Sequence, residues 1–486
     1  MKKEYDYIVI GAGAAGLSFA ALMEKKGFTV AVLEAHSLPG GCSSYFERDG
    51  YIFDAGATTL SGLKLGRPID RLMKELNLKL ELINIDPGIV SILGDKKINR
   101  FRDFEKWINE LNTNFPEINH RKFWNKLKRL EIHGWDLSST FKNIPLRSFK
   151  SLFSFFSKKV PGALLTAPSL FRSVDSEIKK NHINDSDYLK MIDELLFITA
   201  QNNRFDTPLL MGAMGLCYPE DTAYAIGGMK AFSQSLASKC SHLFYKHQVQ
   251  KIVSTPKFFE VKTNHESFTA KNVVSTIPIW NHAELFDDPK AQQFFAKNKM
   301  PDTKDCWSAF MIYLTIPRDI TRAGLYYQIH SDNIPHCHTK SFFVSLSHPD
   351  DQLRSLNGRQ VVTISTHTKY AEWINLDQAD YKRKKEESKN YIFKILKEKF
   401  QLQEADLQNV LTGSPKTFVK YTKRYSGLVG GIPHSLKRNP LDFIIARSPY
   451  KNFYMLGDTQ FPGQGIAAVV LGSLNLVDYL VTNEGH

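Results

Sequence analysis

The sequence contains few cysteines and no long apolar run. Its five cysteines lie far apart among 486 residues and form no Cys-x-x-Cys pair, which argues against a disulfide framework and a structural zinc site. No apolar run approaches the ~18–20 residues that a membrane-spanning helix needs. A predicted strand already begins at Tyr5, which leaves no room for a signal peptide. These absences predict a cytoplasmic protein and confine any membrane attachment to one side.

Low-complexity tracts and fixed-period repeats are also lacking. The apolar share of 42% and the charged share of 23% are typical of a folded globular protein, and the length suggests two domains. A net charge of +13 favours an anionic partner, either a membrane surface or a nucleic acid. No nucleic-acid-binding motif is present, and the basic run over residues 380–400 carries an apolar stripe that predicts a solvated amphipathic helix. We therefore expect no nucleic acid. We also expect no metal site, because the adjacent His336, Cys337 and His338 rarely point at one ion in such a run.

The first 34 residues show two predicted strands joined by a glycine-rich turn and a helix. An apolar run over residues 5–10 predicts a buried parallel strand, and the turn Gly11-Ala12-Gly13-Ala14-Ala15-Gly16 follows at once. A helix is predicted over 17–26 and a second strand over 29–33, which Glu34 closes. Strand, glycine-rich turn, helix, strand and acid occur in the order that binds a dinucleotide.

Each part of this unit has an expected role. Gly11 permits the tight turn, Gly13 lets the backbone approach a pyrophosphate, and Gly16 lets the helix pack on the strand. The helix N-terminus offers free N–H groups to the phosphates, and Ala14 and Ala15 of the turn are predicted as further cofactor contacts. Glu34, followed by Ala35, is expected to accept hydrogen bonds from a ribose 2′-hydroxyl, which argues against a 2′-phosphorylated cofactor.

A second small-residue turn favours FAD over NAD. Gly40, Gly41 and Cys42 follow the acid by a few residues, and a further small-residue segment ends in Thr58 and Thr59. A second turn beside the first lets the backbone run along a longer cofactor, which an NAD site would not need. We therefore predict these residues as FAD contacts.

The C-terminal end repeats the glycine pattern without repeating the domain. Residues 463–468 match it loosely, but too little chain follows for a second unit, which needs about thirty residues. We predict one strand over 452–456, the turn residues Gly457 and Asp458, and a helix over 466–480. Asp458 suits ribityl hydroxyls, and the helix N-terminus at Gly465 and Ile466 would stabilise negative charge on a reduced flavin. The two ends of the chain are thus predicted to bind one FAD between them.

Two segments carry a resemblance to a known family. "GGCSSYFERDGYIFDAGATTL" and "LGDTQFPGQGIAAVVLGS" resemble the phytoene desaturase and carotenoid isomerase branch of the amine oxidase-like flavoprotein superfamily. Amine oxidases usually have an arginine after the paired glycines, where this chain has Cys42. The resemblance implies an α/β fold with a discontinuous Rossmann-like FAD-binding domain (1–63, 206–278 and 443–486) and an inserted α+β substrate domain (64–205 and 279–442). It also implies that the backbone of Val249 meets the adenine.

The same resemblance implies an FAD-dependent oxidoreductase or isomerase that acts on a long apolar polyene, by desaturation or by cis–trans isomerisation. A retinol-saturase-like reductase and an amine oxidase share most of these motifs and stay open as alternatives. From another class, a prenyl-protein escort-type binding protein has a related fold but uses no flavin. No Ser/His/Asp triad or telling pair of carboxylates is present, so no catalytic residue is assigned; His434, beside Gly430 and Gly431, is a candidate for the flavin face.

A basic amphipathic segment follows in the first part of the predicted substrate domain. Phe149, Leu152, Phe153, Phe156 and Val160 fall on one helical face, and basic residues fall opposite. This pattern suits a helical region near 146–172 that associates with an anionic membrane, although a surface helix packed on its own core fits equally. The oligomeric state stays open.

Overall fold

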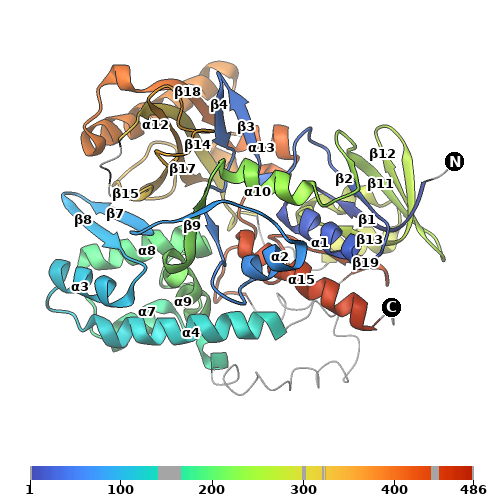
Figure 1. The fold of residues 1–486 in the computed structure, drawn as a ribbon, viewed down its shortest axis with the longest axis horizontal. Helices are drawn as coiled ribbons and strands as arrows, with labels where there is room; N and C mark the ends of the chain where they lie inside the picture. Colours follow the sequence, from blue (N-terminus) through green and yellow to red (C-terminus); the bar gives the residue numbers. More distant parts are fainter. Residues whose placement is uncertain are drawn as a thin grey trace.

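The computed structural model describes residues 3–140, 166–297, 303–319, 322, 324–438 and 448–483 (Figure 1). Within them the chain builds two large sheets and a layer of helices. The part of the predicted membrane-associating region that precedes residue 166 lies outside the described residues.

The first sheet collects strands from both ends and the middle of the chain. Its order is β10-β2-β1-β13-β12-β11, with β19 beside β13. The strands β10, β2, β1, β13 and β19 run parallel, and β11, β12 and β13 form an antiparallel meander. The bounds are β1 (Lys3–Ile10), β2 (Val30–Leu33), β10 (His242–Phe244), β11 (Val249–Ser254), β12 (Phe259–Thr263), β13 (Ser267–Ser275) and β19 (Phe453–Met455).

Both faces of this sheet are buried. Successive side chains of a strand point to opposite faces, so one strand contributes to two hydrophobic cores. Tyr7 and Val9 of β1 join the core under one set of helices, whereas Ile8 and Ile10 join the core on the other face. The first set is α1 (Ala14–Lys25), α2 (Pro68–Leu76), α10 (Gly228–Ala237) and α15 (Ile466–Asn483), and the other face carries α11 (Pro289–Lys297).

The second sheet stands beside the first (Figure 1). Its order is β18-β14-β17-β16-β15-β7-β8. The long helix α12 (Gln378–Phe400) packs on it through Ile392 and Leu396, which confirms the apolar stripe predicted over 380–400. The strands are β7 (Ile89–Leu93), β8 (Lys96–Arg100), β14 (Ser308–Pro317), β15 (Tyr326–His330), β16 (Ser341–Leu346), β17 (Arg359–Thr368) and β18 (Gln408–Gly413).

A helical layer and two small sheets complete the described fold. The helices share a separate apolar core and are α3 (Phe104–Asn114), α4 (His120–Thr140), α7 (Val174–Lys180), α8 (Ser186–Ala200) and α9 (Leu209–Cys217). One small sheet is the hairpin β3 (Tyr45–Arg48) and β4 (Tyr51–Asp54). The other has the order β5 (Leu60–Ser61), β9 (Thr222–Ala225) and β6 (Leu82–Asn84). Helix α13 (Pro415–Thr422) precedes the return of the chain to the first sheet.

Hydrophobic packing does not follow the predicted domain boundaries at every point. Ile69 and Leu72 of α2 join the core of the first sheet, and so does Phe295 of α11. The boundaries predicted at residues 63 and 279 place both helices in the substrate domain. The division into domains stays a prediction.

Three strands of the first sheet end side by side. Ile10 of β1 pairs in register with Ser275 of β13, which pairs with Met455 of β19. The loops that follow these strands therefore leave the sheet at the same edge. In sheets of this type, ligands bind at the carboxyl ends of the parallel strands.

Candidate active site

A cavity of about 1010 Å³ opens at this edge of the first sheet. Every residue predicted as a cofactor contact lines it, with the exception of Gly16. These lining residues are Gly11, Gly13, Ala14, Ala15, Glu34, Ala35, Gly40, Gly41, Cys42, Thr58, Thr59, Val249, Gly457, Asp458, Gly465 and Ile466. The structure thus brings residues from both ends and the middle of the chain to one space, while their contacts with the cofactor stay a prediction.

Gly16 lies behind the cavity wall, where the helix meets the strand. A Cβ atom on this residue would lie 2.1 Å from the carbonyl oxygen of Gly11 and 3.1 Å from Cγ1 of Val9. Only a residue without a side chain allows α1 to approach β1 this closely. This is the packing role predicted for Gly16.

The N-termini of two helices face the cavity. Helix α1 begins at Ala14, three residues before the predicted start, and α15 begins at Ile466 as predicted. A Cβ atom on Gly13 or on Gly465, the residues just before these helices, would meet no atom within 4 Å. Open space therefore reaches the bare backbone beside both helix ends, where free N–H groups favour anionic groups. This geometry fits a dinucleotide with phosphates at one helix and a flavin at the other.

Glu34 follows β2 and lines the cavity. Its two carboxylate oxygens accept the backbone N–H groups of Ala12 and His36, each at 2.7 Å. Burial raises the pKa of Glu34, although these two hydrogen bonds act in the opposite direction. Each carboxylate oxygen has two lone pairs, so capacity for a ribose hydroxyl remains.

The second small-residue turn packs directly against the first. The backbone N–H of Gly40 donates to the carbonyl of Ala12 at 2.8 Å. A Cβ atom on Gly41 would lie 3.2 Å from Cα of Gly13, so these backbones touch. Cys42 follows on the cavity wall. The two turns form one continuous backbone surface along the cavity.

Thr58 and Thr59 contact the second sheet and the segment before β9 through their hydroxyls. The Thr58 hydroxyl shares a hydrogen bond of 2.6 Å with the hydroxyl of Ser345 in β16, and the Thr59 hydroxyl contacts that of Tyr218. Their own hydroxyls are therefore engaged by the protein in this structure. Any contact that they make with the cofactor can use their backbone.

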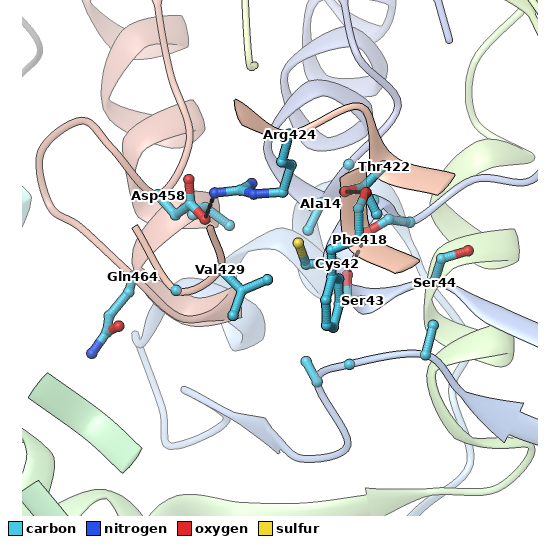
Figure 2. A pocket seen from close by; sticks show the side chains of 18 of the residues that line it. Ala14, Cys42, Ser43, Ser44, Phe418, Thr422, Arg424, Val429, Asp458 and Gln464 are labelled. Carbon is cyan, nitrogen blue, oxygen red and sulfur yellow. Dashed lines mark hydrogen bonds and ion pairs between the residues drawn. The ribbon is translucent and has the colours of Figure 1, made fainter. Parts of the chain in front are cut away.

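Asp458 has a partner that the sequence did not reveal. Its Oδ2 accepts a hydrogen bond of 2.7 Å from Nη2 of Arg424, and the guanidinium also lies beside Cys42 (Figure 2). The prediction assigned Asp458 to ribityl hydroxyls and did not mention Arg424. The one available signal was the position of Arg424 in the segment that leads the chain back to the first sheet.

The cavity continues from these residues into an apolar part. There the wall comes from the second sheet and from the helical layer. Its apolar side chains include Trp135, Ile198, Met214, Met311, Tyr313 and Phe343. One space thus joins the predicted cofactor contacts to a region suited to an apolar molecule.

Two of the histidines that line the same cavity, His434 and His367, have a lowered pKa. Burial lowers the pKa of His434 to about 4, and the nearby Arg438 acts in the same direction. Burial also lowers the pKa of His367 to about 4, together with the neighbouring charge of Lys369. Both imidazoles are therefore neutral at pH 7. Sequence reasoning named His434 and missed His367, which lies on β17 without any motif around it.

No metal site emerges from the described parts of the chain, where no three His, Cys, Asp or Glu side chains are placed to hold an ion. His336 pairs with Glu387 at 2.5 Å and His338 pairs with Glu372 at 3.1 Å, so the two histidines engage different carboxylates.

The sequence model of the flavin-containing amine oxidoreductases matches residues 14–471, which is most of the chain. The chain belongs to this family. It is an FAD-dependent oxidoreductase in the broad sense that includes flavin-dependent isomerases.

Individual relatives agree with this assignment. A chloroplastic prolycopene isomerase of Daucus carota is 28% identical over 504 residues, covering 97% of this chain and 79% of the relative. A 1-hydroxycarotenoid 3,4-desaturase of a Flavobacterium species is 25% identical over 337 residues, covering 67% of this chain and 66% of the relative. The crystal structure of an oxidoreductase from Methanosarcina mazei superposes with a TM-score of 0.63 at 16% identity, covering 97% of this chain and 99% of that one. The predicted family resemblance and the predicted fold class are confirmed.

The described residues include no helix that is both long enough and apolar enough to cross a membrane.

Proposed function

We propose that this enzyme changes the cis–trans configuration of double bonds in a long apolar polyene. The observation that carries the proposal is the match to prolycopene isomerase, which extends over 97% of this chain. The cavity supports it, because the predicted cofactor contacts and an apolar wall enclose one continuous space of about 1010 Å³. A polyene bound along the apolar wall would lie in the same space as the flavin.

The chemistry would come from the bound flavin, which can transfer electrons or a hydride reversibly. The protein would orient the polyene and exclude water, through side chains such as Met311, Phe343 and Met214. The N-terminus of α15, at Ile466, faces the same space and stabilises negative charge that develops there.

Desaturation of a polyene is the second candidate function, and the similarity to the hydroxycarotenoid desaturase favours it. In that reaction two hydrogens leave the substrate, whereas isomerisation leaves its mass unchanged. A retinol-saturase-like reductase would instead add two hydrogens. An amine oxidase would act on a polar cation, for which the apolar side chains of the cavity are poorly suited.

The predicted membrane contact would supply such a lipid-soluble substrate. The net charge of +13 supports attachment to an anionic surface on one side of a membrane. This contact and the cytoplasmic location stay predictions.

The decisive experiment expresses the protein in cells that supply poly-cis and all-trans carotenes and compares the products by chromatography and mass spectrometry. A changed isomer pattern at constant mass would establish isomerisation. A loss of two hydrogens would establish desaturation, and a gain of two would establish reduction. If the flavin-loaded protein leaves every carotene unchanged, the polyene proposal is wrong.

A further inference from the structure

Arg424 lies where segments from the two ends of the chain meet. It follows α13, and only 10% of its side-chain surface is exposed. Its Nη2 donates to Asp458 from the C-terminal end, and its Nε donates to the carbonyl of Leu428. The guanidinium also interacts with the thiol of Cys42 from the N-terminal end (Figure 2). Arg424 therefore connects the segments of Cys42 and Asp458, which are predicted to bind FAD together.

Packing places this guanidinium close to the first glycine-rich turn. Cys42 is the neighbour of Gly41, and the backbone of Gly41 touches that of Gly13 at the N-terminus of α1. Figure 2 shows Ala14, the first residue of α1, next to Cys42 and below Arg424. The turn from Gly11 to Ala14 is the predicted site of the pyrophosphate, so Arg424 stands beside that site.

Among the described lining residues, Arg424 is also the most shielded lysine or arginine. Arg48 has 61% of its side chain exposed, and Lys423 is exposed as well. A charge that is shielded from water interacts more strongly with a bound anion than an exposed one does. A guanidinium carries five donors in a planar fork that matches phosphate oxygens, more than the hydrogen bonds to Asp458 and Leu428 use.

We propose that Arg424 is a cofactor-binding residue that recognises the diphosphate of FAD, with Asp458 and Leu428 holding its side chain in place. Cys42 contributes through its size, because its small thiol leaves room for the guanidinium that arrives from another segment. The proposal rests on the predicted place of the diphosphate at the α1 turn and is independent of the polyene.

The test compares two ligands that share the flavin ring and differ in the diphosphate. Flavin-free wild-type and Arg424→Gln proteins are titrated with FAD and with riboflavin, and binding is followed by flavin fluorescence. We expect the Kd for FAD to rise about 10- to 100-fold, as for the loss of a charge-assisted phosphate contact, and the Kd for riboflavin to change less than about 3-fold. Equal weakening of both ligands, or no change in either, would overturn the proposal.

The rival explanation is that Arg424 only neutralises the charge of Asp458, whose side chain is 16% exposed. The double variant Arg424→Gln/Asp458→Asn removes both charges. Recovery of FAD binding in this variant would show that pairing with Asp458 is the whole role of Arg424, whereas we expect the Kd for FAD to stay high. Arg354→Gln is the matched control, because it removes an arginine that pairs with Asp54 at 2.9 Å and does not line the cavity. It should leave the ratio of the two Kd values unchanged.

Arg424→Lys covers the case in which the glutamine variant does not fold. It keeps the positive charge and loses the planar fork. We expect it to raise the Kd for FAD about 3- to 10-fold without a matching change for riboflavin. An unchanged Kd for FAD in this variant would mean that the fork makes no contact with the diphosphate.

Discussion

The hydroxyl of Ser473 in α15 donates a hydrogen bond of 2.8 Å to the backbone carbonyl of Ala15 in α1. This bond ties the last helix of the chain to the first turn of the first helix. The N-termini of both helices face the same cavity. The contact therefore sets the spacing between the end that we assign to the phosphates and the end that we assign to the flavin.

Ser473→Ala should lower the free energy of unfolding by about 1 kcal/mol, the usual net value of a buried hydrogen bond. Urea denaturation of the two proteins measures the difference. Ser18→Ala is the matched control, because the Ser18 hydroxyl is buried in α1 and has no hydrogen-bond partner among the described residues. Removing that hydroxyl should change stability by less than about 0.5 kcal/mol or increase it. Equal losses in both variants would contradict the role given to Ser473.

Gly13 and Gly16 should respond in opposite ways to an added side chain. Gly13→Val places its side chain in open cavity space and should leave the fold intact, while it raises the Kd for FAD at least about tenfold. Gly16→Ala places a Cβ 2.1 Å from the Gly11 carbonyl and should lower the melting temperature of the flavin-free protein. Fluorescence titration and thermal denaturation separate the two effects. A stable Gly13→Val protein that binds FAD normally would show that the cofactor does not approach this backbone.

The contrast between these glycines and Arg424 shows what the sequence can predict here. The turn from Gly11 to Gly16 and the helix that begins at Ile466 are specified by neighbouring residues, so local patterns identified both and predicted their ligand. The bridge from Arg424 to Asp458 and Cys42, and the bond from Thr58 to Ser345, join segments that are distant in the chain. Such contacts depend on how the two sheets pack against each other. The residue patterns of a single sequence do not predict that packing.

His282 should make the stability of the protein depend on pH. It is fully buried, and burial lowers its pKa to about 4, although hydrogen bonds to the carbonyls of Ile279 and Pro278 act in the opposite direction. An unfolded histidine has a pKa of about 6.5, so the unfolded chain takes up this proton first as the pH falls. The folded state is therefore favoured above pH 6.5, and this advantage is lost progressively between about pH 6.5 and pH 4.

The size of this effect can be measured by removing the titrating group. At pH 5 the linkage amounts to about 2 kcal/mol. Urea denaturation at pH 7 and pH 5 should thus show a smaller loss of stability for His282→Gln than for the wild type, by about that amount. The absolute stability of the variant at pH 7 should be lower, because its contact with the Ser275 hydroxyl is altered. If both proteins lose the same stability on acidification, His282 is not the source.

His367 should make the cavity bind hydroxylated polyenes in preference to hydrocarbon polyenes. Its ring packs edge-on against Phe197, with centroids 5.4 Å apart, and against Trp307 at 6.1 Å. Among the described residues no side-chain hydrogen bond to this ring is present, and the ring lines the cavity. A neutral imidazole there presents one donor and one acceptor to the occupant, and a hydrocarbon can satisfy neither. A buried polar group that loses water without gaining a partner costs binding free energy.

His367→Phe removes this cost while it preserves the aromatic packing. The KM for an all-hydrocarbon polyene should fall about 3- to 10-fold, and the KM for a hydroxylated polyene of the same length should stay constant or rise. Both are measured from product formation by chromatography, with the Kd for FAD as the control that should not change. If KM changes in the same direction for both polyenes, His367 only fills space and does not distinguish polar from apolar substrates. A changed Kd for FAD would place the ring against the cofactor instead of the substrate.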